Sequence, residues 1–285
     1  MLQVLQAGRA LAAISVAAFH LSIFMGLDRY GGNAVFREFT SQGNRGVDFF
    51  FVLSGFIILF AHVNDIDKPA AWKEYAYRRF VRLYPIYWVY TGVFVLLLSF
   101  GLGTDAKYPS NIGDWLTSLT LIRFTDGAPP LLVAWTLFHE IAFYAAFSIL
   151  ILSKRIGIIV LSLAALVCLV LFDYPETNDR NAFNVYTAAY NLYFLFGMGA
   201  YWMYRRGGHG IVEFVVGLCL AAVALTIAMP VGLSSIVVVA GLALVVAGAT
   251  KLEMAGYIKV PVFSPLSAMP PTASIWCTSL WRGCC

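Results

Sequence analysis

The sequence predicts an all-α fold, a polytopic bundle of transmembrane helices. Hydrophobic residues make up 60% of the 285 residues and charged residues only 12%, whereas about a quarter of a soluble domain is charged. The mean hydropathy is +0.78. The apolar residues gather in runs close to the ~20 residues that a helix needs to cross a bilayer. A water-soluble domain of this length does not bury so much apolar surface, so we expect a membrane-embedded chain.

Eight apolar runs define the expected spans, which together form a bundle of about eight helices. These runs are residues 6–25, 47–63, 84–102, 131–152, 156–172, 185–204, 211–229 and 231–250. The segment 112–122 is too short and too polar to span, and we expect it at the membrane interface. The first run has no basic cluster before it, so we expect a retained helix and not a cleaved signal peptide.

The Lys and Arg residues predict the orientation of the bundle. Five of them lie in the loop 64–83, and when this loop is cytoplasmic, 11 loop cations fall on the cytoplasmic side and six on the other, with Arg9 and Arg282 not counted. We therefore expect a multi-pass protein with a cytoplasmic N-terminus. The net charge of +4 is modest, and no basic tract with interleaved aromatic residues occurs, so we expect no nucleic-acid partner. The five cysteines show no metal-ligand spacing, and we expect no metal site.

The first expected span contains two ionisable residues, Arg9 and His20. Their separation corresponds to about three helical turns, so both side chains should lie on one helix face, ~16 Å apart. Ionisable groups inside membrane helices normally face a wet cavity or the interior of the bundle. The simpler alternatives are that Arg9 snorkels to the lipid headgroups and that His20 is a packed, hydrogen-bonded residue.

The next two segments also combine polar and apolar residues. In "GVDFFFVLSGFII", Asp48 opens an otherwise apolar helix, where its charge favours the helix N-terminus, and Ser54 and Gly55 favour close helix packing. In "RRFVRLYPIYW", three arginines precede an expected helix with Pro85 in its first turn. They serve either as a cytoplasmic membrane anchor or as a phosphate-binding lip, because Arg matches phosphate in geometry as well as in charge. These arginines are Arg78, Arg79 and Arg82.

The fourth segment, "WTLFHEIAFY", places His139 and Glu140 near the outer end of the run 131–152. Adjacent helical residues point about 100° apart, so only one of the two is expected to face a given cavity. A glutamate inside a membrane helix is a candidate functional residue. By contrast, His62 lies at the end of a span, and we expect it to be solvated.

These four segments, in this order over residues 3–144, resemble acyltransferase family 3. This family comprises integral-membrane O-acyltransferases that modify bacterial surface sugars. The form "WTLFHEIAFY" is most similar to its exopolysaccharide acetyltransferase branch. Beyond residue 150 the resemblance is only a series of hydrophobic helices.

The resemblance implies a bacterial inner-membrane enzyme of about ten helices in an intact relative. It would move an acetyl or other acyl group from cytoplasmic acetyl-CoA to a hydroxyl of a cell-surface or lipid-linked polysaccharide, with no permanently bound cofactor. His20 would be the base, Arg9 would hold the donor or polarise its thioester, and Glu140 would orient a catalytic group or hold the acceptor. Direct transfer and a covalent histidine route both fit the sequence. The resemblance also implies donor- or substrate-binding roles for Arg78, Arg79, Arg82, Asp48 and His139.

The C-terminal sequence departs from the family pattern. The family continues with a helix similar to "SYSIYLVH", whereas this chain ends "LSAMPPTASIWCTSLWRGCC". Synonymous codons for Pro271–Thr278 can spell Tyr-Ser-Ile-Tyr-Leu-Val-His in another reading frame. We therefore divide the chain into an acyltransferase-like domain, residues 1–268, and an aberrant, frameshifted tail, residues 269–285. A divergent but intact tail is the alternative, and the codons of the gene distinguish the two.

Two other functions fit the same residues. In a membrane transporter or exporter of a polar solute or glycan, Arg9, His20 and Glu140 would form a proton or solute relay. The sequence lacks the paired Gly/Pro-broken helices in two matching halves that many transporters have. The other alternative is an inactive, truncated remnant. The sequence indicates neither the acceptor sugar nor the oligomeric state.

Overall fold

The computed structural model describes residues 2–28, 32, 37–101, 108–127, 129–171, 182–227 and 229–259. In this part of the chain the structure is all-helical, without strands, as the sequence predicts. The helices are α1 (Gln3–Met25), α2 (Arg37–Thr40), α3 (Arg45–His62), α4 (Trp72–Ser99), α5 (Ile112–Thr120), α6 (Trp135–Leu152), α7 (Lys154–Val170), α8 (Ala182–Thr187), α9 (Tyr190–Arg205), α10 (Ile211–Thr226) and α11 (Val231–Met254). The expected tail, residues 269–285, and its boundary lie outside the described residues.

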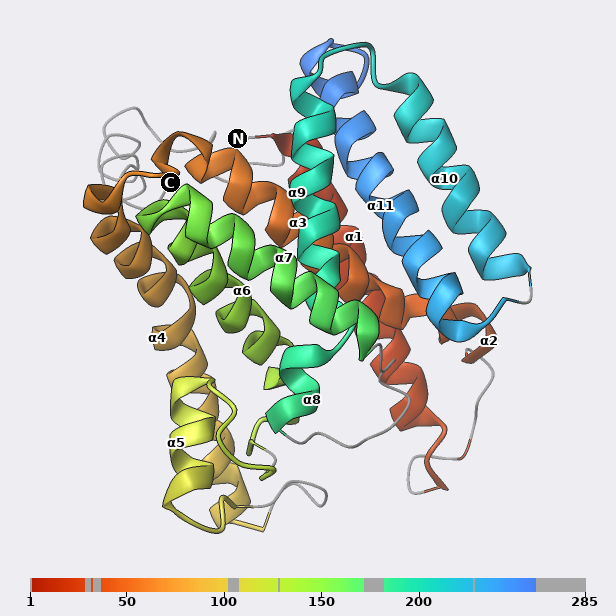
Figure 1. Ribbon diagram of the computed structural model, residues 1–285. Helices are drawn as coiled ribbons and strands as arrows, with labels where there is room; N and C mark the ends of the chain where they lie inside the picture. The colour runs from red at the N-terminus through yellow and green to blue at the C-terminus, as the bar shows by residue number, and fades with distance from the viewer. Residues whose placement is uncertain are drawn as a thin grey trace, which may run out of the picture.

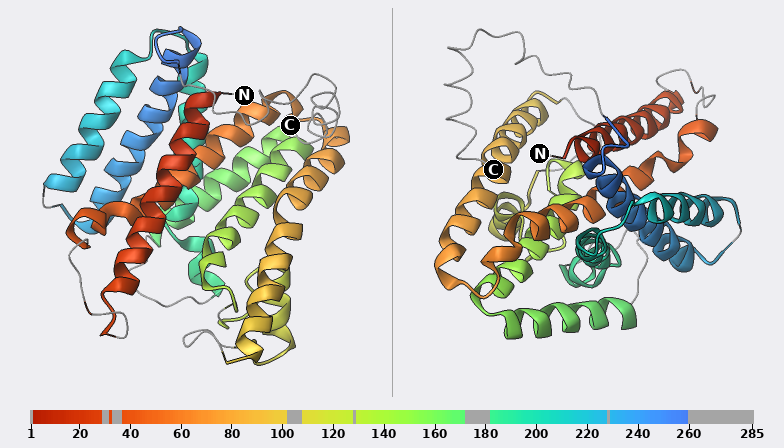
Figure 2. Two further views of the ribbon diagram at one scale, coloured as in Figure 1. Left: turned by 180° about the vertical axis from the view of Figure 1, so that it is seen from behind. Right: turned by 90° about the horizontal axis from the view of Figure 1, so that it is seen from above.

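The helices run up and down through one bundle, with α10 and α11 side by side at one edge and α4 with α5 at the other (Figures 1 and 2). Within the described ranges, five helical segments are long and apolar enough to cross a membrane, and they contain α1, α3, α4, α6 and α11. The shorter helix α10 is also apolar. Each expected span corresponds to a helix, and the short α5 corresponds to the segment 112–122. The span 185–204 is divided between α8 and α9 by Ala188 and Ala189.

One expected boundary is wrong by more than three turns. Helix α4 begins at Trp72 and not near residue 84, so Pro85 lies inside the helix and not in its first turn. A proline removes one backbone hydrogen bond, but membrane helices tolerate it because neighbouring groups satisfy the freed carbonyl. The consequence is that Arg78, Arg79 and Arg82 are helical residues with fixed directions and not members of a loop.

The centre of the bundle is the contact between α3 and α9, where two glycines allow the backbones to touch. A Cβ atom added to Gly55 would lie 2.0 Å from the carbonyl oxygen of Phe194, and one added to Gly197 would lie 1.9 Å from that of Val52. The predicted close packing at Gly55 is therefore confirmed. Buried aromatic residues, including Phe56, surround this contact and form the core. Small residues at such contacts are typical of membrane helix packing.

Helix α1 is anchored at both of its ends. At its beginning, the backbone N–H groups of Gln3 and Val4 donate to the carboxylate of Glu253 in α11, at 2.6 and 3.1 Å. Towards its end, the Thr40 hydroxyl donates to the Ser22 hydroxyl at 2.7 Å. These contacts fix the height of α1 relative to α3 and α11, on which the position of its ionisable residues depends.

Candidate functional site

A cavity of about 510 Å³ lies among α1, α3, α4 and α6. This volume is within the ~300–1,000 Å³ typical of small-molecule sites. Most of its wall is apolar, but a few polar side chains converge on it from all four helices. They include Arg9, His20, Ser54, Arg82, Glu140 and Tyr144. The cavity therefore combines two cations, a carboxylate and an imidazole in a largely apolar surrounding.

Close packing of α1 on the start of α3 turns one face of α1 towards this cavity. A Cβ atom added to Gly46 would lie 2.7 Å from the carbonyl oxygen of Ala12, so the two backbones nearly touch there. Arg9, Val16 and His20 share the neighbouring face of α1, and all three line the cavity. The predicted common face of Arg9 and His20 is thus confirmed, because a helical spacing of 3.6 residues per turn brings them into register.

The hydrogen bonding of His20 leaves one ring nitrogen available. Its Nδ1 lies 2.8 Å from the carbonyl oxygen of Val16. A carbonyl oxygen only accepts, so Nδ1 is the donor and carries the proton. In the neutral imidazole Nε2 then has a free lone pair, which is the state that a general base requires.

Arg9, Arg82 and Glu140 form the charged part of the cavity wall. Arg9 comes from α1, Arg82 from α4 and Glu140 from α6, so three helices bring these charges to one cavity. The Tyr144 hydroxyl donates to the Glu140 carboxylate, one helical turn away on α6. Two guanidinium groups beside one carboxylate leave a net positive charge, which favours an anionic ligand such as a phosphate ester.

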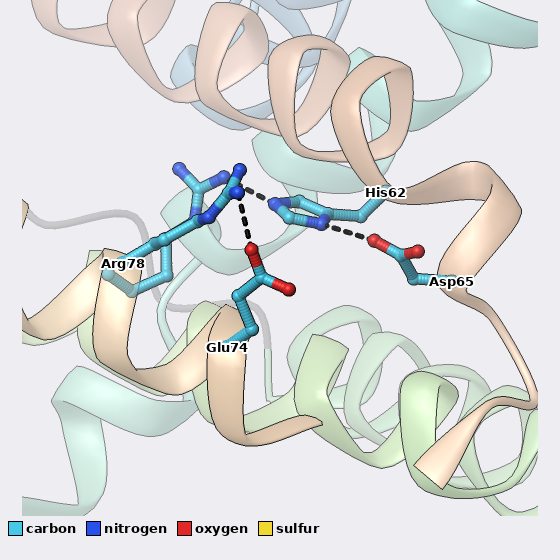
Figure 3. A network of polar contacts seen from close by, with 5 residues as sticks. His62, Asp65, Glu74 and Arg78 are labelled. Atoms are coloured by element: carbon cyan, nitrogen blue, oxygen red, sulfur yellow. Dashed lines mark hydrogen bonds and ion pairs between the residues drawn. The ribbon is translucent and has the colours of Figure 1, made fainter. Parts of the chain in front are cut away.

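The structure does not bring Arg78 and Arg79 into the cavity. Arg78 forms an ion pair with Glu74 at 2.5 Å, as Figure 3 shows. The Arg79 Nη2 atom donates to Nε2 of His62 at 2.8 Å. Of the three arginines in this row only Arg82 lines the cavity. Arg79 points about 100° away from Arg78, whereas Arg78 shares the face of Arg82 one turn earlier and pairs there with Glu74.

His139 and Asp48 also lie outside the cavity lining. His139 is 4% exposed, and its Nδ1 donates to Oδ1 of Asn191 at 3.1 Å. Its ring packs edge-on against those of Phe51 and Trp135. Glu140 lines the cavity and His139 does not, so the expectation that only one of these neighbours faces it is confirmed.

Asp48 is held in a buried polar cluster between α3 and α11. Its Oδ2 atom accepts from Nη1 of Arg45 at 3.2 Å, and the same nitrogen donates to the Ser235 hydroxyl at 2.9 Å. Only 3% of Asp48 is exposed. Asp48 lies in the first turn of α3, as the sequence predicts for a helix N-terminal charge, and Arg45 links it to Ser235 of α11.

Sequence reasoning missed two residues near this site. Tyr144 was not singled out, although it lies four residues after Glu140 and residues four apart share a helix face. His62 was expected to be solvated, and this was wrong: it is 6% exposed and bonds to Asp65 (Figure 3). Its other ring nitrogen accepts from Arg79. The burial of His62 depends on the packing of the beginning of α4 against the end of α3. The hydrophobic pattern within one segment does not predict such a contact between two segments.

Comparisons with known proteins give one family and one relative. A family model described as an acyltransferase domain matches residues 3–281. The chain is similar to the exopolysaccharide production protein ExoZ of Rhizobium meliloti (strain 1021), with 29% identity over 190 residues. This alignment covers 64% of the chain and 57% of the relative, so it spans less than two thirds of the length of that protein. No solved structure gives a significant match.

Proposed function

The chain belongs to the acyltransferase domain family, and from this premise we propose that it moves an acetyl group from cytoplasmic acetyl-CoA to a hydroxyl of a cell-surface or lipid-linked polysaccharide. The observation that supports this most is the cavity that Arg9, His20, Arg82 and Glu140 share. The name of the relative, an exopolysaccharide production protein, supports the acceptor class. We further propose a bacterial inner membrane and a cytoplasmic N-terminus.

In the proposed reaction, Nε2 of His20 takes the proton from the acceptor hydroxyl. The oxygen attacks the thioester carbonyl, a C–O bond forms and the C–S bond breaks. The imidazolium then returns the proton to the departing thiolate, so that free coenzyme A leaves. A positioned base of this kind contributes roughly 10²–10⁴-fold to a rate.

The other cavity residues supply binding and orientation in this scheme. Arg82 and Arg9 bind the anionic donor, and Arg9 polarises the thioester carbonyl as its oxygen gains negative charge. The Glu140 carboxylate, held by Tyr144, accepts a hydrogen bond from a sugar hydroxyl of the acceptor. Holding both substrates in one cavity makes the transfer effectively unimolecular.

Acyl transfer by the purified full chain tests this proposal. In detergent or nanodiscs, with labelled acetyl-CoA and a bacterial exopolysaccharide, we expect label to enter the polysaccharide. His20→Ala should lower the rate at least about 100-fold without lowering the thermal unfolding midpoint. The matched control is His209→Ala, in the turn between α9 and α10 and away from the cavity lining.

Two outcomes would count against the proposal. If His20→Ala and His209→Ala both retain wild-type transfer, His20 is not the base. If proteoliposomes containing the wild-type chain take up a polar solute and transfer no acyl group, the transporter alternative is favoured.

A further inference from the structure

Arg79 lies behind the cavity wall, although the sequence grouped it with Arg82 as a phosphate-binding residue. Its guanidinium carbon is 5.6 Å from the centre of the Tyr75 ring and 5.5 Å from that of the Tyr144 ring. A guanidinium at such a distance over an aromatic face attracts the ring, more strongly where water is excluded. Tyr144 lines the cavity and Arg79 does not, so Arg79 contacts the back of a wall residue.

The partner of Arg79 on the other side is a histidine with a fixed proton position. Arg79 Nη2 and His62 Nε2 are 2.8 Å apart, and a guanidinium only donates, so Nε2 is unprotonated. The other ring nitrogen, Nδ1, lies 2.8 Å from Oδ2 of Asp65 and donates to it (Figure 3). His62 is therefore the neutral tautomer that links the carboxylate to the arginine. Protonation of Nε2 would remove this acceptor and place a second cation against Arg79.

Tyr144 connects this chain of contacts to the cavity. Its backbone carbonyl accepts from the Tyr75 hydroxyl at 3.1 Å, and its own hydroxyl donates to Glu140. Tyr75 is 2% exposed and Tyr144 is 6% exposed, so few alternative positions are open to either ring. The direction of the Tyr144 hydroxyl depends on Arg79, which contacts the other side of the ring. The direction of the Glu140 carboxylate depends in turn on that hydroxyl.

We infer that Arg79 is a positioning residue: fixed by Asp65 through neutral His62, it holds Tyr144 so that the Tyr144 hydroxyl keeps Glu140 directed into the cavity. This inference rests on the function proposed above for the cavity. Arg79 then affects the rate of the transfer step, whereas Arg82 and Arg9 bind the donor. Arg79 and Arg82, three residues apart on α4, thus have separate tasks.

Steady-state kinetics on the full-length protein separates positioning from phosphate binding. We expect Arg79→Gln to lower kcat roughly ten- to a hundredfold, the range that a small misplacement of a reacting group produces, with a donor KM within about twofold of wild type. Arg79→Lys keeps the charge but loses the planar contact of the guanidinium with the ring. We expect its kcat to lie between those of the wild type and Arg79→Gln. Arg205→Gln, near Tyr201 at the end of α9, is the matched control for loss of a cytoplasmic-end arginine.

Substitutions of His62 provide a second test that does not depend on Arg79 itself. His62→Gln offers an amide oxygen that can accept from Arg79, so we expect it to keep most of the wild-type kcat. His62→Leu offers no acceptor and should reproduce the loss seen in Arg79→Gln. The double variant His62→Leu/Arg79→Gln should be no slower than either single variant, because residues in one hydrogen-bonded chain are not additive.

The inference is overturned if Arg79→Gln raises the acetyl-CoA KM about tenfold while kcat stays unchanged. A fully additive double variant would also overturn it. Either result leaves the proposed acyl transfer intact, because that is read from wild-type turnover and from His20→Ala. The unfolding midpoint of each variant, measured in the same detergent, separates lost positioning from lost folding.

Discussion

Helices α3 and α11 are embedded in the bundle, whereas α1 and α4 lie against it with few of their residues buried. About half of the apolar window is buried in the segments of α3 and α11, 50% and 56%, against 11% in α1 and 17% in α4. The first pair is held through glycine contacts with α9 and α10, and the second pair supplies Arg9, His20 and Arg82. The tightly packed helices thus form the scaffold, and the loosely packed α1 and α4 supply the two cations and the imidazole of the site, to which α6 adds Glu140.

The largest effect is expected in the scaffold. In Gly197→Ala the new Cβ would lie 1.9 Å from the Val52 carbonyl oxygen, so α3 and α9 must separate. We expect this overpacking to lower the free energy of unfolding by about 3 kcal/mol or more, measured as a loss of folded protein in detergent. Gly199→Ala, two residues on in α9, meets nothing within 4 Å and is the control. Equal unfolding midpoints for Gly197→Ala and Gly199→Ala would show that α9 is not closely packed against α3.

A smaller effect, on donor binding and not on folding, is expected in the loosely packed helix α4. Arg82→Gln removes a cation from the cavity wall on an exposed stretch of α4, so folding should be unaffected. A charge-assisted hydrogen bond contributes about 1.5–3 kcal/mol, so the acetyl-CoA KM should rise about tenfold or more. Titration of initial rates against donor concentration measures this. A wild-type KM with a lowered unfolding midpoint would contradict the comparison, because it would make Arg82 part of the scaffold.

The smallest effect is expected at the contact between α11, a tightly packed helix, and the beginning of α1, a loosely packed one. Glu253 caps the beginning of α1 from the end of α11, and loss of a helix cap costs about 0.5–2 kcal/mol. Glu253→Ala should therefore lower the unfolding midpoint slightly and the transfer rate a few-fold, because the height of Arg9 depends on this contact. Glu253→Gln retains one acceptor oxygen and should lie between. If Glu253→Ala changes neither quantity, the position of α1 is fixed by its packing on α3 alone.

The sequence predicted the helices and part of the site because both depend on local periodicity. Run lengths located the spans, the 3.6-residue repeat placed Arg9 and His20 on one face, and the 100° step separated His139 from Glu140. The direction of Arg78 and Arg79 was not predictable, because it follows from the early start of α4. The burial of His62 was not predictable either, since it arises between two helices, and hydropathy reports only the average environment of a single segment.

The bond from Nδ1 of His20 to the Val16 carbonyl has a directional consequence. Because Nδ1 is bonded within its own helix, only Nε2 of the ring can exchange a proton with a substrate. In the proposed transfer, the sugar oxygen and then the departing sulfur must both approach Nε2. The angle at which α1 presents the ring would then select among sugar hydroxyls by their approach, before any contact with the rest of the polysaccharide is made.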